Sequence, residues 1–464
     1  MKKLSNLLLA LVLMIILALS CFVSCSKDEV KDVRVIEVWS NAGATQDAMA
    51  EIVKEFNENQ GKERGIEIKY SVYLNDYPTI IESAMQNDQA AEILMIPGDQ
   101  RKINYAKKGD DDVIAINDMP GGEEFLKAYG EDSLDGKEKI DGKVYYVNIA
   151  QTVKGLVYNK DLFKKAGIVD ENGEALPPKT TGELVEYAKK LTDKSANIYG
   201  LGLPLKNQGW IMLSYPQMAT FGELSPNGEI EKIDWDSETY EFTEHWLEYI
   251  DFVKAIKNSD ATFPGAEGLD NDTMRAQFAA GRIGMFIADS WDVGVLNDQF
   301  KATCDWGVAP VPVYDGYERF ENPSSRTSGY MFSKKAAECK EDAMFVYEYL
   351  MGEEVCLKLY EGGYYIPIRK GVAEKADESK FDKNWAAFGN LVAGQNIVRK
   401  LIPSLAPEGD TKEIKEQLVW QDPSVDASAF IPELNKTYTE ALRKGIKDGS
   451  IEIKDSALNV SLTG

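Results

Sequence analysis

The sequence predicts an α/β fold divided into two domains. Segments with the alternating pattern of strands are followed by segments with helical spacing, and this order recurs along the chain. The chain has 464 residues. A single hydrophobic core rarely serves more than about 250–300 residues. We therefore expect two domains, of which the first has a largely parallel sheet covered by helices.

Three strand-like segments alternate with two helix-like segments at the start of the first domain. They cover, in chain order, residues 33–39, 49–56, 66–72, 80–86 and 92–96. Thr45 is the expected N-cap of the first helix. Ligands of parallel sheets bind where strands end, so we expect the loops 40–44 and 97–100 to lie at a binding edge.

Further helix and strand patterns predict the second domain. Thr180 and Glu183 have the spacing of a capping box, and an apolar stripe follows them. A helix is expected over 274–278, and a strand over 283–287 leads into a polar and aromatic loop. Residues 314–328 are rich in Pro, Ser, Asn and Arg, which predicts a connector between the domains.

The N-terminus has the pattern of a secretory leader. Two lysines precede an almost unbroken apolar run over 7–19, and Cys21 and Cys25 follow with small neighbours. This arrangement resembles the lipobox of bacterial lipoproteins. We predict a signal peptide over 1–24, lipidation at Cys25 and a tether over 25–32.

Three alternatives remain for the leader. Cys21 could carry the lipid, although Phe22 and Val23 would then be exposed in the tether. A plain leader without a lipid is the second alternative. A transmembrane anchor is the third, because about 20 apolar residues span a bilayer.

The charge of the chain argues against a nucleic-acid partner. Lys and Arg number 52 against 76 Asp and Glu, a formal net charge of −24. Loss of the two leader lysines would make it −26. Binding of phosphates needs clustered Lys and Arg, and the basic residues here are dispersed among acids, as in 183–190.

Histidine and cysteine usage argues against a catalytic triad that depends on histidine and against a histidine-based metal site, and we expect no metal or cofactor. His245 is the one histidine, and its helical neighbours predict that it flanks a packed face. Cys304, Cys339 and Cys356 have no metal-ligand spacing. A Cys339–Cys356 disulfide is one alternative. In the other, Cys356 packs as a small apolar residue on one helix that begins near Met344.

Five motifs, in order, carry a resemblance to a known family. They are GLVYNKDLFKKAGI from Gly155, PPKTTGELVEYAKKLT from Pro177, MRAQFAAGRIGMFIADSWDVG from Met274, WGVAPVPV from Trp306, and SGYMFSKKAAECKEDAMFVYEYLMGEEVCLKLYEGGYYIPIRKG from Ser328. The chain resembles the family 1 extracellular solute-binding proteins, the sugar-binding lipoproteins of ABC importers that include maltose-binding protein. The likeness spans residues 36–369, and the last hundred residues match only loosely.

The resemblance implies a two-lobe, periplasmic-binding-protein-like fold of class II, with a ligand cleft between lobes that a hinge joins. The chain would cross the hinge near 149–152, near 324–329 and again after 369. Lobe 1 would comprise residues 33–150 and 326–371, and lobe 2 residues 151–325 and 372–464. Contacts that a ligand makes only with both lobes would drive closure.

The resemblance also places candidate ligand-binding residues. Asn41 matches the asparagine that faces the ligand after the first strand, and Asp99 matches the aspartate after the third. Thr152 stands where a polar residue precedes the Tyr-Asn-Lys motif. Trp291 matches a tryptophan that stacks on a sugar ring, and Trp210 lies where an aromatic platform is often found.

Further candidates are Asp289, Gly329, Tyr330 and Tyr364. Maltose-binding protein carries charged residues just after the asparagine, where this chain has Gly43 and Ala44. This departure argues against maltose itself as the ligand.

The residue types suit a sugar on chemical grounds. Carboxylates and amides pair with hydroxyls, and flat aromatic rings cover the apolar face of a sugar ring. A buried, unpaired hydroxyl costs about 1–3 kcal/mol, so such side chains select for a hydroxyl pattern.

The expected function is that of a monomeric, non-enzymatic receptor, lipid-anchored in a bacterial cell envelope and facing the periplasm or the exterior. It would capture a carbohydrate, preferably an oligosaccharide, and deliver it to the permease subunits of an ABC transporter. The same fold could instead bind a peptide, a polyamine or another small solute. A secreted glycoside hydrolase would need two carboxylates about 5–9.5 Å apart, whereas the loops hold single acids, Asp99 and Asp289.

Overall fold

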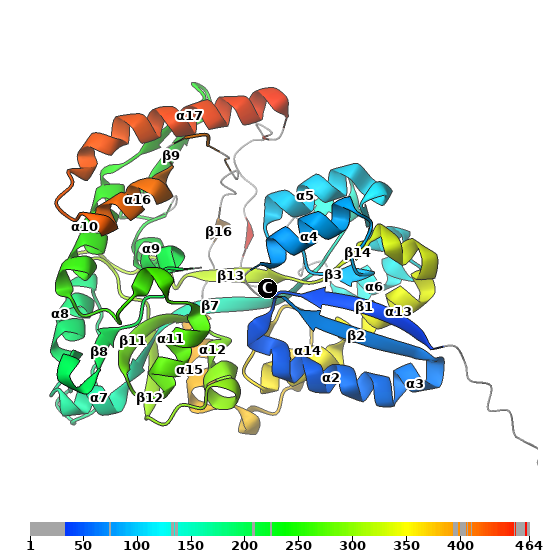
Figure 1. Cartoon of the computed structure of the whole chain (residues 1–464), viewed down its shortest axis with the longest axis horizontal. Helices are drawn as coiled ribbons and strands as arrows, with labels where there is room; N and C mark the ends of the chain where they lie inside the picture. The colour runs from blue at the N-terminus through cyan, green and yellow to red at the C-terminus, as the bar shows by residue number, and fades with distance from the viewer. Residues whose placement is uncertain are drawn as a thin grey trace, which may run out of the picture.

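The computed structural model describes residues 33–449, apart from 74–75, 131–133, 135–137, 207–208, 223–224, 393–397, 400–404, 406 and 410, together with 451 and 460–461. The expected α/β class is confirmed, with helices packed around two mixed sheets (Figure 1). The predicted leader and tether, with Cys21 and Cys25, lie outside the described residues.

The first sheet, in the half we call lobe 1, has the strand order β2-β1-β3-β14-β4. Its strands are β1 (Arg34–Ser40), β2 (Ile66–Val72), β3 (Ile93–Leu94), β4 (Val113–Ile114) and β14 (Met331–Ser333). The strand β1 runs parallel to β2 and β3, and β14 runs antiparallel to β3 and β4. Its helices are α2 (Gln46–Glu58), α3 (Gln60–Arg64), α4 (Tyr77–Gln86), α5 (Asp99–Lys108), α6 (Gly122–Tyr129), α13 (Lys340–Leu350) and α14 (Glu353–Glu361).

The second sheet, in lobe 2, has the order β12-β7-β11-β8. Its strands are β7 (Asn148–Asn159), β8 (Tyr199–Leu201), β11 (Ile283–Asp289) and β12 (Trp306–Pro310). The helices of this lobe are α7 (Lys160–Lys165), α8 (Thr181–Leu191), α9 (Gly209–Thr220), α10 (Glu244–Ser259), α11 (Asn271–Ala279), α12 (Asp292–Gly294), α15 (Lys383–Val392), α16 (Lys412–Gln421) and α17 (Ile431–Asp448), with the hairpin β9 (Glu231–Asp234) and β10 (Thr239–Phe242).

Side-chain caps fix the start of two helices in lobe 2. The Thr180 hydroxyl accepts a hydrogen bond from the Glu183 backbone N–H at 3.2 Å, so the predicted cap of α8 is confirmed. Asn159 ends β7, and its side-chain oxygen accepts from the Leu162 N–H at 3.0 Å. The Tyr-Asn-Lys motif therefore makes the turn from a buried strand into a helix.

Two segments distant in the sequence pair with the first half of β7. The strand β13 (Ser324–Ser328) pairs with it antiparallel, with Ser325 opposite Thr152. The short strand β15 (Ile366–Pro367) also pairs antiparallel, with Ile366 opposite Gln151. In Figure 1, β7 and β13 lie between the two groups of elements. The second half of β7 belongs to the lobe 2 sheet, so one strand serves both the crossing region and lobe 2.

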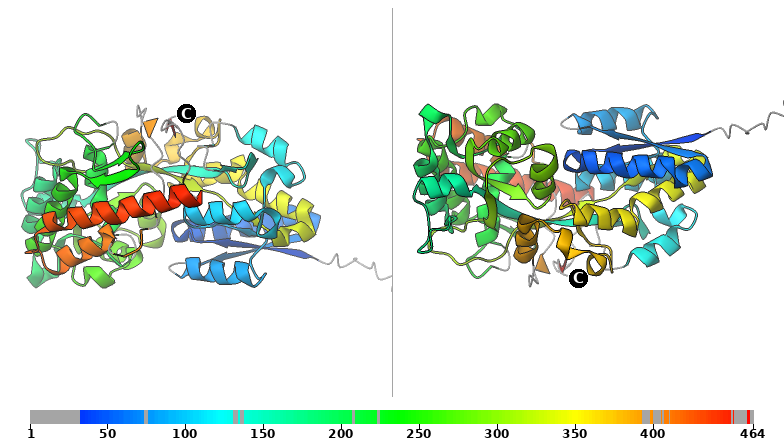
Figure 2. Two further views of the ribbon diagram at one scale, coloured as in Figure 1. Left: turned by 90° about the horizontal axis from the view of Figure 1, so that it is seen from above. Right: turned by 90° about the horizontal axis from the view of Figure 1, so that it is seen from below.

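The buried hydrophobic residues separate into clusters on either side of this crossing. Two clusters draw only on residues 36–150 and 330–365. Two others draw only on residues 153–314 and 385–438. Views from above and below place the two groups toward opposite ends of the longest axis, with one end of α17 reaching over the elements of lobe 1 (Figure 2). The described chain therefore has two cores.

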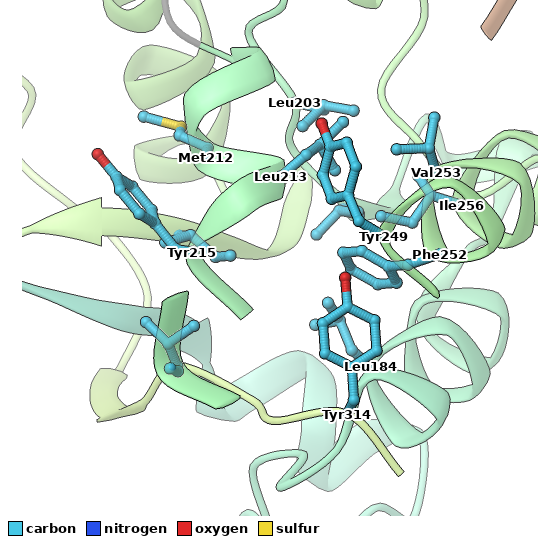
Figure 3. Packing of buried hydrophobic residues seen from close by; sticks show 14 of the residues in the cluster. Leu184, Leu203, Met212, Leu213, Tyr215, Tyr249, Phe252, Val253, Ile256 and Tyr314 are labelled. Atoms are coloured by element: carbon cyan, nitrogen blue, oxygen red, sulfur yellow. The ribbon is translucent and has the colours of Figure 1, made fainter. Parts of the chain in front are cut away.

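The larger core of lobe 2 is rich in aromatic residues. Phe252 and Tyr314 meet edge to face, with ring centroids 6.0 Å apart, and Leu184 of α8 lies beside them (Figure 3). Tyr215 of α9 stands apart from this group in Figure 3, with its hydroxyl turned away. The His245 ring stacks on that of Phe221, with ring centroids 4.1 Å apart. This contact confirms that the histidine flanks a packed face.

Two expectations about residues 340–361 are wrong. The single helix expected from Met344 through Cys356 is broken, because α13 ends at Leu350 and α14 begins at Glu353. The chain bends at Gly352. Because of this bend, a Cβ there would lie only 2.8 Å from the Glu348 carbonyl oxygen. Cys339 and Cys356 are free and buried, so the disulfide alternative fails and the packing alternative holds for Cys356.

Within the part of the chain that the structure describes, we find no helix that combines the length and the apolar character needed to cross a membrane.

Gly155 is a position in β7 where packing forbids a side chain. A Cβ there would lie 2.8 Å from the ring of Phe388, and Phe388 is fully buried. Overpacking of a core costs about 1–3 kcal/mol. We expect Gly155→Ala to lower the free energy of unfolding by that amount in urea denaturation.

The neighbouring Gly389 on α15 supplies a matched control. It is exposed, and a Cβ there would meet no atom within 4 Å. Because glycine is a poor helix former, Gly389→Ala should raise stability by about 0.5–1 kcal/mol. Equal effects of the two substitutions would contradict the packing described for β7.

A buried carboxyl group lies in α16. Glu416 is 6 % exposed. Burial raises the pKa of its carboxyl to about 8; Lys412 opposes the shift, and Glu413 and Glu231 add to it. Its ordinary pKa is 4.5. Since the folded pKa is the higher one, the folded protein keeps a proton that the unfolded chain releases between these two values.

The contribution of Glu416 to stability is therefore present below pH 4.5 and is lost as the pH rises toward about 8. Glu416→Gln keeps a neutral side chain at every pH. We expect the difference in unfolding free energy between the variant and the wild type to grow in favour of the variant from about pH 5 to about pH 8. Denaturant titrations across this range would show it, and a constant difference would contradict it.

Candidate ligand-binding site

Candidate residues follow the ends of two parallel strands in lobe 1. Asn41 comes directly after β1 and is exposed. Asp99 is the first residue of α5, just beyond β3. Because β1 and β3 are parallel neighbours, their ends lie at the same edge of the sheet. The two side chains are therefore on one side of lobe 1, as the sequence predicts.

A buried lysine stands behind Asp99. The Nζ atom of Lys102 lies 3.0 Å from Asp99 Oδ1, and it also donates to Ser328 Oγ at 2.5 Å. The Lys102 side chain is 5 % exposed, whereas that of Asp99 is 45 % exposed. The carboxylate is thus open to solvent on one side and held by an ammonium group on the other.

A second lysine stands behind Asp289 in lobe 2. The Nζ atom of Lys154 lies 2.6 Å from Asp289 Oδ1. The two groups form an ion pair. Lys154 Nζ also donates to Ser325 Oγ at 2.7 Å and to Thr152 Oγ1 at 3.3 Å. Both members of the ion pair are buried.

Aromatic rings flank this second pair. The ring centroid of Trp291 lies 5.8 Å from Lys154 Nζ, and that of Tyr215 lies 5.6 Å away. Trp291 is half-buried at the start of α12. Burial raises the pKa of the Tyr215 hydroxyl far above its ordinary value, and the Asp289 carboxylate raises it further. Tyr215 therefore keeps its proton and can donate.

A deeper ion pair supports the loop that carries Asp289. The Nε atom of Arg275 donates to Asp292 Oδ1 at 2.7 Å, and both residues are buried. The other carboxylate oxygen of Asp292 accepts the Asp289 backbone N–H at 3.0 Å. The end of β11 is thus fixed from α11 on one side and from β7 on the other.

Four of the predicted residues have other partners. Thr152 is fully buried, and its hydroxyl lies 3.0 Å from that of Ser325. Gly329 is buried, and its N–H donates to the Val147 carbonyl. The hydroxyl of the buried Tyr330 lies 3.1 Å from that of Tyr70. The hydroxyl of the buried Tyr364 donates a hydrogen bond to Asp298 at 2.7 Å. Trp210 lies in α9, and its side chain is outside the described residues.

The Tyr364 contact joins the two lobes. Tyr364 belongs to a core cluster of lobe 1, and Asp298 follows α12 of lobe 2. A Cβ on Gly294 would lie 2.4 Å from the Tyr364 ring, so the glycine permits the close approach. Gln299 adds a second link, because its side-chain amide donates to the Ala44 carbonyl at 2.9 Å.

The sequence reasoning missed the two lysines and their serine partners. Lys154 stands in the otherwise apolar run Thr-Val-Lys-Gly-Leu-Val, and a charge inside a buried strand signals a paired group. Lys102 lies three residues after Asp99, which is contact spacing on a helix. The sequence carried no comparable sign for Ser325 or Ser328.

The comparisons with known proteins identify the family. The sequence model of the bacterial extracellular solute-binding proteins matches residues 51–389. Since this match covers well over half of the chain, the chain belongs to that family. The resemblance drawn from the sequence motifs is confirmed.

Curated relatives share about a quarter of their residues with the chain. The sn-glycerol-3-phosphate-binding periplasmic protein UgpB of Brucella melitensis is 27% identical over 357 residues, which are 74% of this chain and 76% of the relative. The protein of the same name from Rhizobium meliloti is 25% identical over 367 residues, 75% of this chain and 78% of the relative.

Solved structures confirm the two-lobe, periplasmic-binding-protein-like fold. The maltose/maltodextrin-binding domain MalE of Bdellovibrio bacteriovorus, bound to maltotriose, has a TM-score of 0.63 at 18% identity, covering 89% of this chain and 100% of the other. The solute-binding protein RafE in complex with raffinose also has a TM-score of 0.63, at 16% identity, covering 88% and 99%. At these identities the likeness shows the fold.

The hydrogen bond between Tyr364 and Asp298 can be measured as a coupling between lobes. In a double-mutant cycle of Tyr364→Phe and Asp298→Ala in the unliganded protein, we expect a coupling energy of about 1 kcal/mol, the usual net value of such a bond. Urea denaturation of the four proteins gives this energy. Additive effects of the two substitutions would show that the contact does not join the lobes in solution.

Proposed function

We propose that this extracellular solute-binding protein captures a carbohydrate and delivers it to the permease subunits of an ABC importer, without catalysing a reaction itself. One observation carries the proposal. A half-buried aromatic ring, Trp291, lies two residues after a carboxylate, Asp289, at the end of a buried strand. Rings cover the apolar face of sugars and carboxylates pair with their hydroxyls.

Lobe 1 supplies complementary groups in this proposal. Asp99 and Asn41 offer a partly exposed carboxylate and an exposed amide at one sheet edge. A ligand held between them and Trp291 would contact both lobes at once. Such a ligand stabilises the closed arrangement, because its contacts with the two lobes form together only there.

The lobe boundaries in this proposal are residues 33–150 with 326–371, and residues 151–325 with 372–464. The pairing of β13 and β15 with β7 supports hinge crossings at these three places. Thr152 and Gly329 fall in the crossing strands and next to them, so we assign them to the hinge rather than to direct ligand contact. Tyr330 and Tyr364 support the wall of lobe 1.

The ligands named for related proteins favour polyhydroxylated solutes. MalE and RafE are described in complex with maltotriose and raffinose. UgpB is named for sn-glycerol-3-phosphate, a smaller and charged polyol derivative. A phosphorylated polyol is therefore the second candidate ligand for this chain, and peptides and polyamines come after it.

The location of the protein follows in part from its family, whose members are extracellular. We propose in addition that Cys25, or Cys21 in its place, carries a lipid that anchors a monomer to the bacterial membrane. Two acyl chains suffice for stable anchoring. Mass spectrometry of the protein from its native membrane would detect the lipid-modified N-terminus. An unmodified N-terminus downstream of Cys25 would exclude the anchor.

A thermal-shift panel tests the function. The panel contains maltotriose, raffinose and chitin and xylan oligosaccharides, with sn-glycerol-3-phosphate and spermidine as charged members. A ligand at about 100 times its Kd stabilises the folded protein by about 2.7 kcal/mol. We expect at least one neutral saccharide to raise the melting temperature. Hydrolysis of any saccharide by the purified protein would overturn the non-enzymatic assignment.

Trp291→Ala tests the aromatic contact. The side chain is half-buried at the start of α12. We expect a loss of saccharide affinity of tenfold or more, with little change in the melting temperature of the unliganded protein. Trp306, a buried tryptophan of the same lobe, supplies the contrast: Trp306→Ala should lower the melting temperature strongly. A strong loss of stability in Trp291→Ala with unchanged affinity would assign that ring to the core.

A further inference from the structure

Two buried lysines hold the two candidate aspartates in place, one in each lobe. Lys102 Nζ lies 3.0 Å from Asp99 Oδ1, and Lys154 Nζ lies 2.6 Å from Asp289 Oδ1. Both lysines are at least nine-tenths buried. Each carboxylate that the proposed function directs at the ligand therefore has an ammonium group behind it.

The same hinge strand anchors both lysines. Lys102 donates to Ser328 Oγ and Lys154 donates to Ser325 Oγ, at 2.5 and 2.7 Å. These serines belong to β13, which pairs with β7 in the crossing region. Three residues of strand span about 10 Å, so β13 sets the spacing of the two ion pairs.

The donor count shows that the lysines serve the protein rather than the ligand. An ammonium group has three N–H donors. Lys154 donates to the hydroxyls of Ser325 and Thr152 at 2.7 and 3.3 Å, and its ammonium group forms the ion pair with Asp289 at 2.6 Å.

Lys102 is used in a similar way. It has two oxygen acceptors, and its Nζ lies 4.6 Å from the centroid of the Tyr146 ring, in cation–π range. Any effect of these lysines on binding therefore acts through the aspartates.

Charge balance is the second consequence of the pairing. The Asp289 carboxylate is buried, and closure over a ligand would bury that of Asp99 as well. A buried carboxylate without a partner is costly, so removal of its lysine leaves a charge that the site must neutralise in another way. With both lysines present, closure over an uncharged ligand leaves no net charge in either pair. A charged ligand would add a charge that neither ion pair neutralises.

We infer that Lys102 and Lys154 are positioning residues that orient Asp99 and Asp289 and cancel their charge, so that the two carboxylates receive ligand hydroxyls rather than a ligand cation. This inference rests on the proposed function, because it takes both aspartates to face the ligand. What it adds is that the two lysines decide whether the site prefers a neutral, a positively charged or a negatively charged ligand.

Calorimetric titrations with three probe classes test the inference. The probes are the best saccharide of the thermal-shift panel, spermidine and sn-glycerol-3-phosphate, each at low and high salt. The variants are Lys154→Met and Lys102→Met, which remove the charge, and Lys154→Arg and Lys102→Arg, which restore it. Matched controls come from exposed ion pairs, Lys383 with Asp305 and Lys143 with Asp118: Lys383→Met and Lys143→Met should bind like the wild type.

The wild type should bind the saccharide with an affinity that salt does not change. Each lysine-to-methionine variant should bind it at least tenfold more weakly and gain salt-sensitive binding of spermidine. The arginine variants should recover most of the saccharide affinity. A merely structural role would weaken every ligand and create no affinity for an amine.

Asp289→Asn gives an independent reading where a methionine variant does not fold. It keeps the shape of the side chain and leaves Lys154 unbalanced, so we expect a gain of salt-sensitive binding of sn-glycerol-3-phosphate. Absence of that gain in a folded Asp289→Asn variant would overturn the inference.

The remaining outcomes separate the inference from the proposed function. Saccharide binding by the methionine variants at wild-type affinity would overturn the inference alone. Preference of the wild type for spermidine or sn-glycerol-3-phosphate over every saccharide would overturn both the inference and the carbohydrate as the ligand, and would leave a receptor for a charged solute. Failure of all three probe classes to bind would overturn the proposed function, and the inference would fall with it.

Discussion

The pairing of β13 and β15 with the first half of β7 holds together the region where the chain crosses between the two cores. Backbone hydrogen bonds from β13 and β15 meet the same few residues, around Gln151 and Thr152. Buried backbone groups must be paired, so this ladder fixes where the chain passes between the two cores. The second half of β7 then joins the lobe 2 sheet. A bend in this strand moves one core relative to the other.

Charged side chains add a second layer to the same region. Lys154 joins the crossing strands to the end of β11, and the pair of Arg275 and Asp292 holds that end from behind. Buried ion pairs gain little net stability, because desolvation offsets most of the attraction. Their value here is geometric: Asp289 and Trp291 are held at a fixed place relative to the hinge. Lys102 and Ser328 do the same for Asp99 in lobe 1.

Local periodicity predicted the early strands and helices well, because side-chain alternation and helical spacing are local properties. The strands β1 and β2 and the helices α2 and α4 lie where the patterns placed them. The sequence pattern does not show the break at Gly352, because the apolar spacing continues across it. The lysine contacts could not be predicted, since their serine partners lie 171 and 226 residues away in the sequence. Tyr364 matched the family pattern, but its bond to Asp298 depends on the packing of Gly294.

We propose that a ligand binds between two lobes that move about the strands paired on β7. Small-angle X-ray scattering of the protein, with and without a saccharide shown to bind, tests it most directly. Closure would bring the two cores together, so we expect a smaller radius of gyration in the bound state. Superimposable scattering profiles at saturating ligand would contradict it.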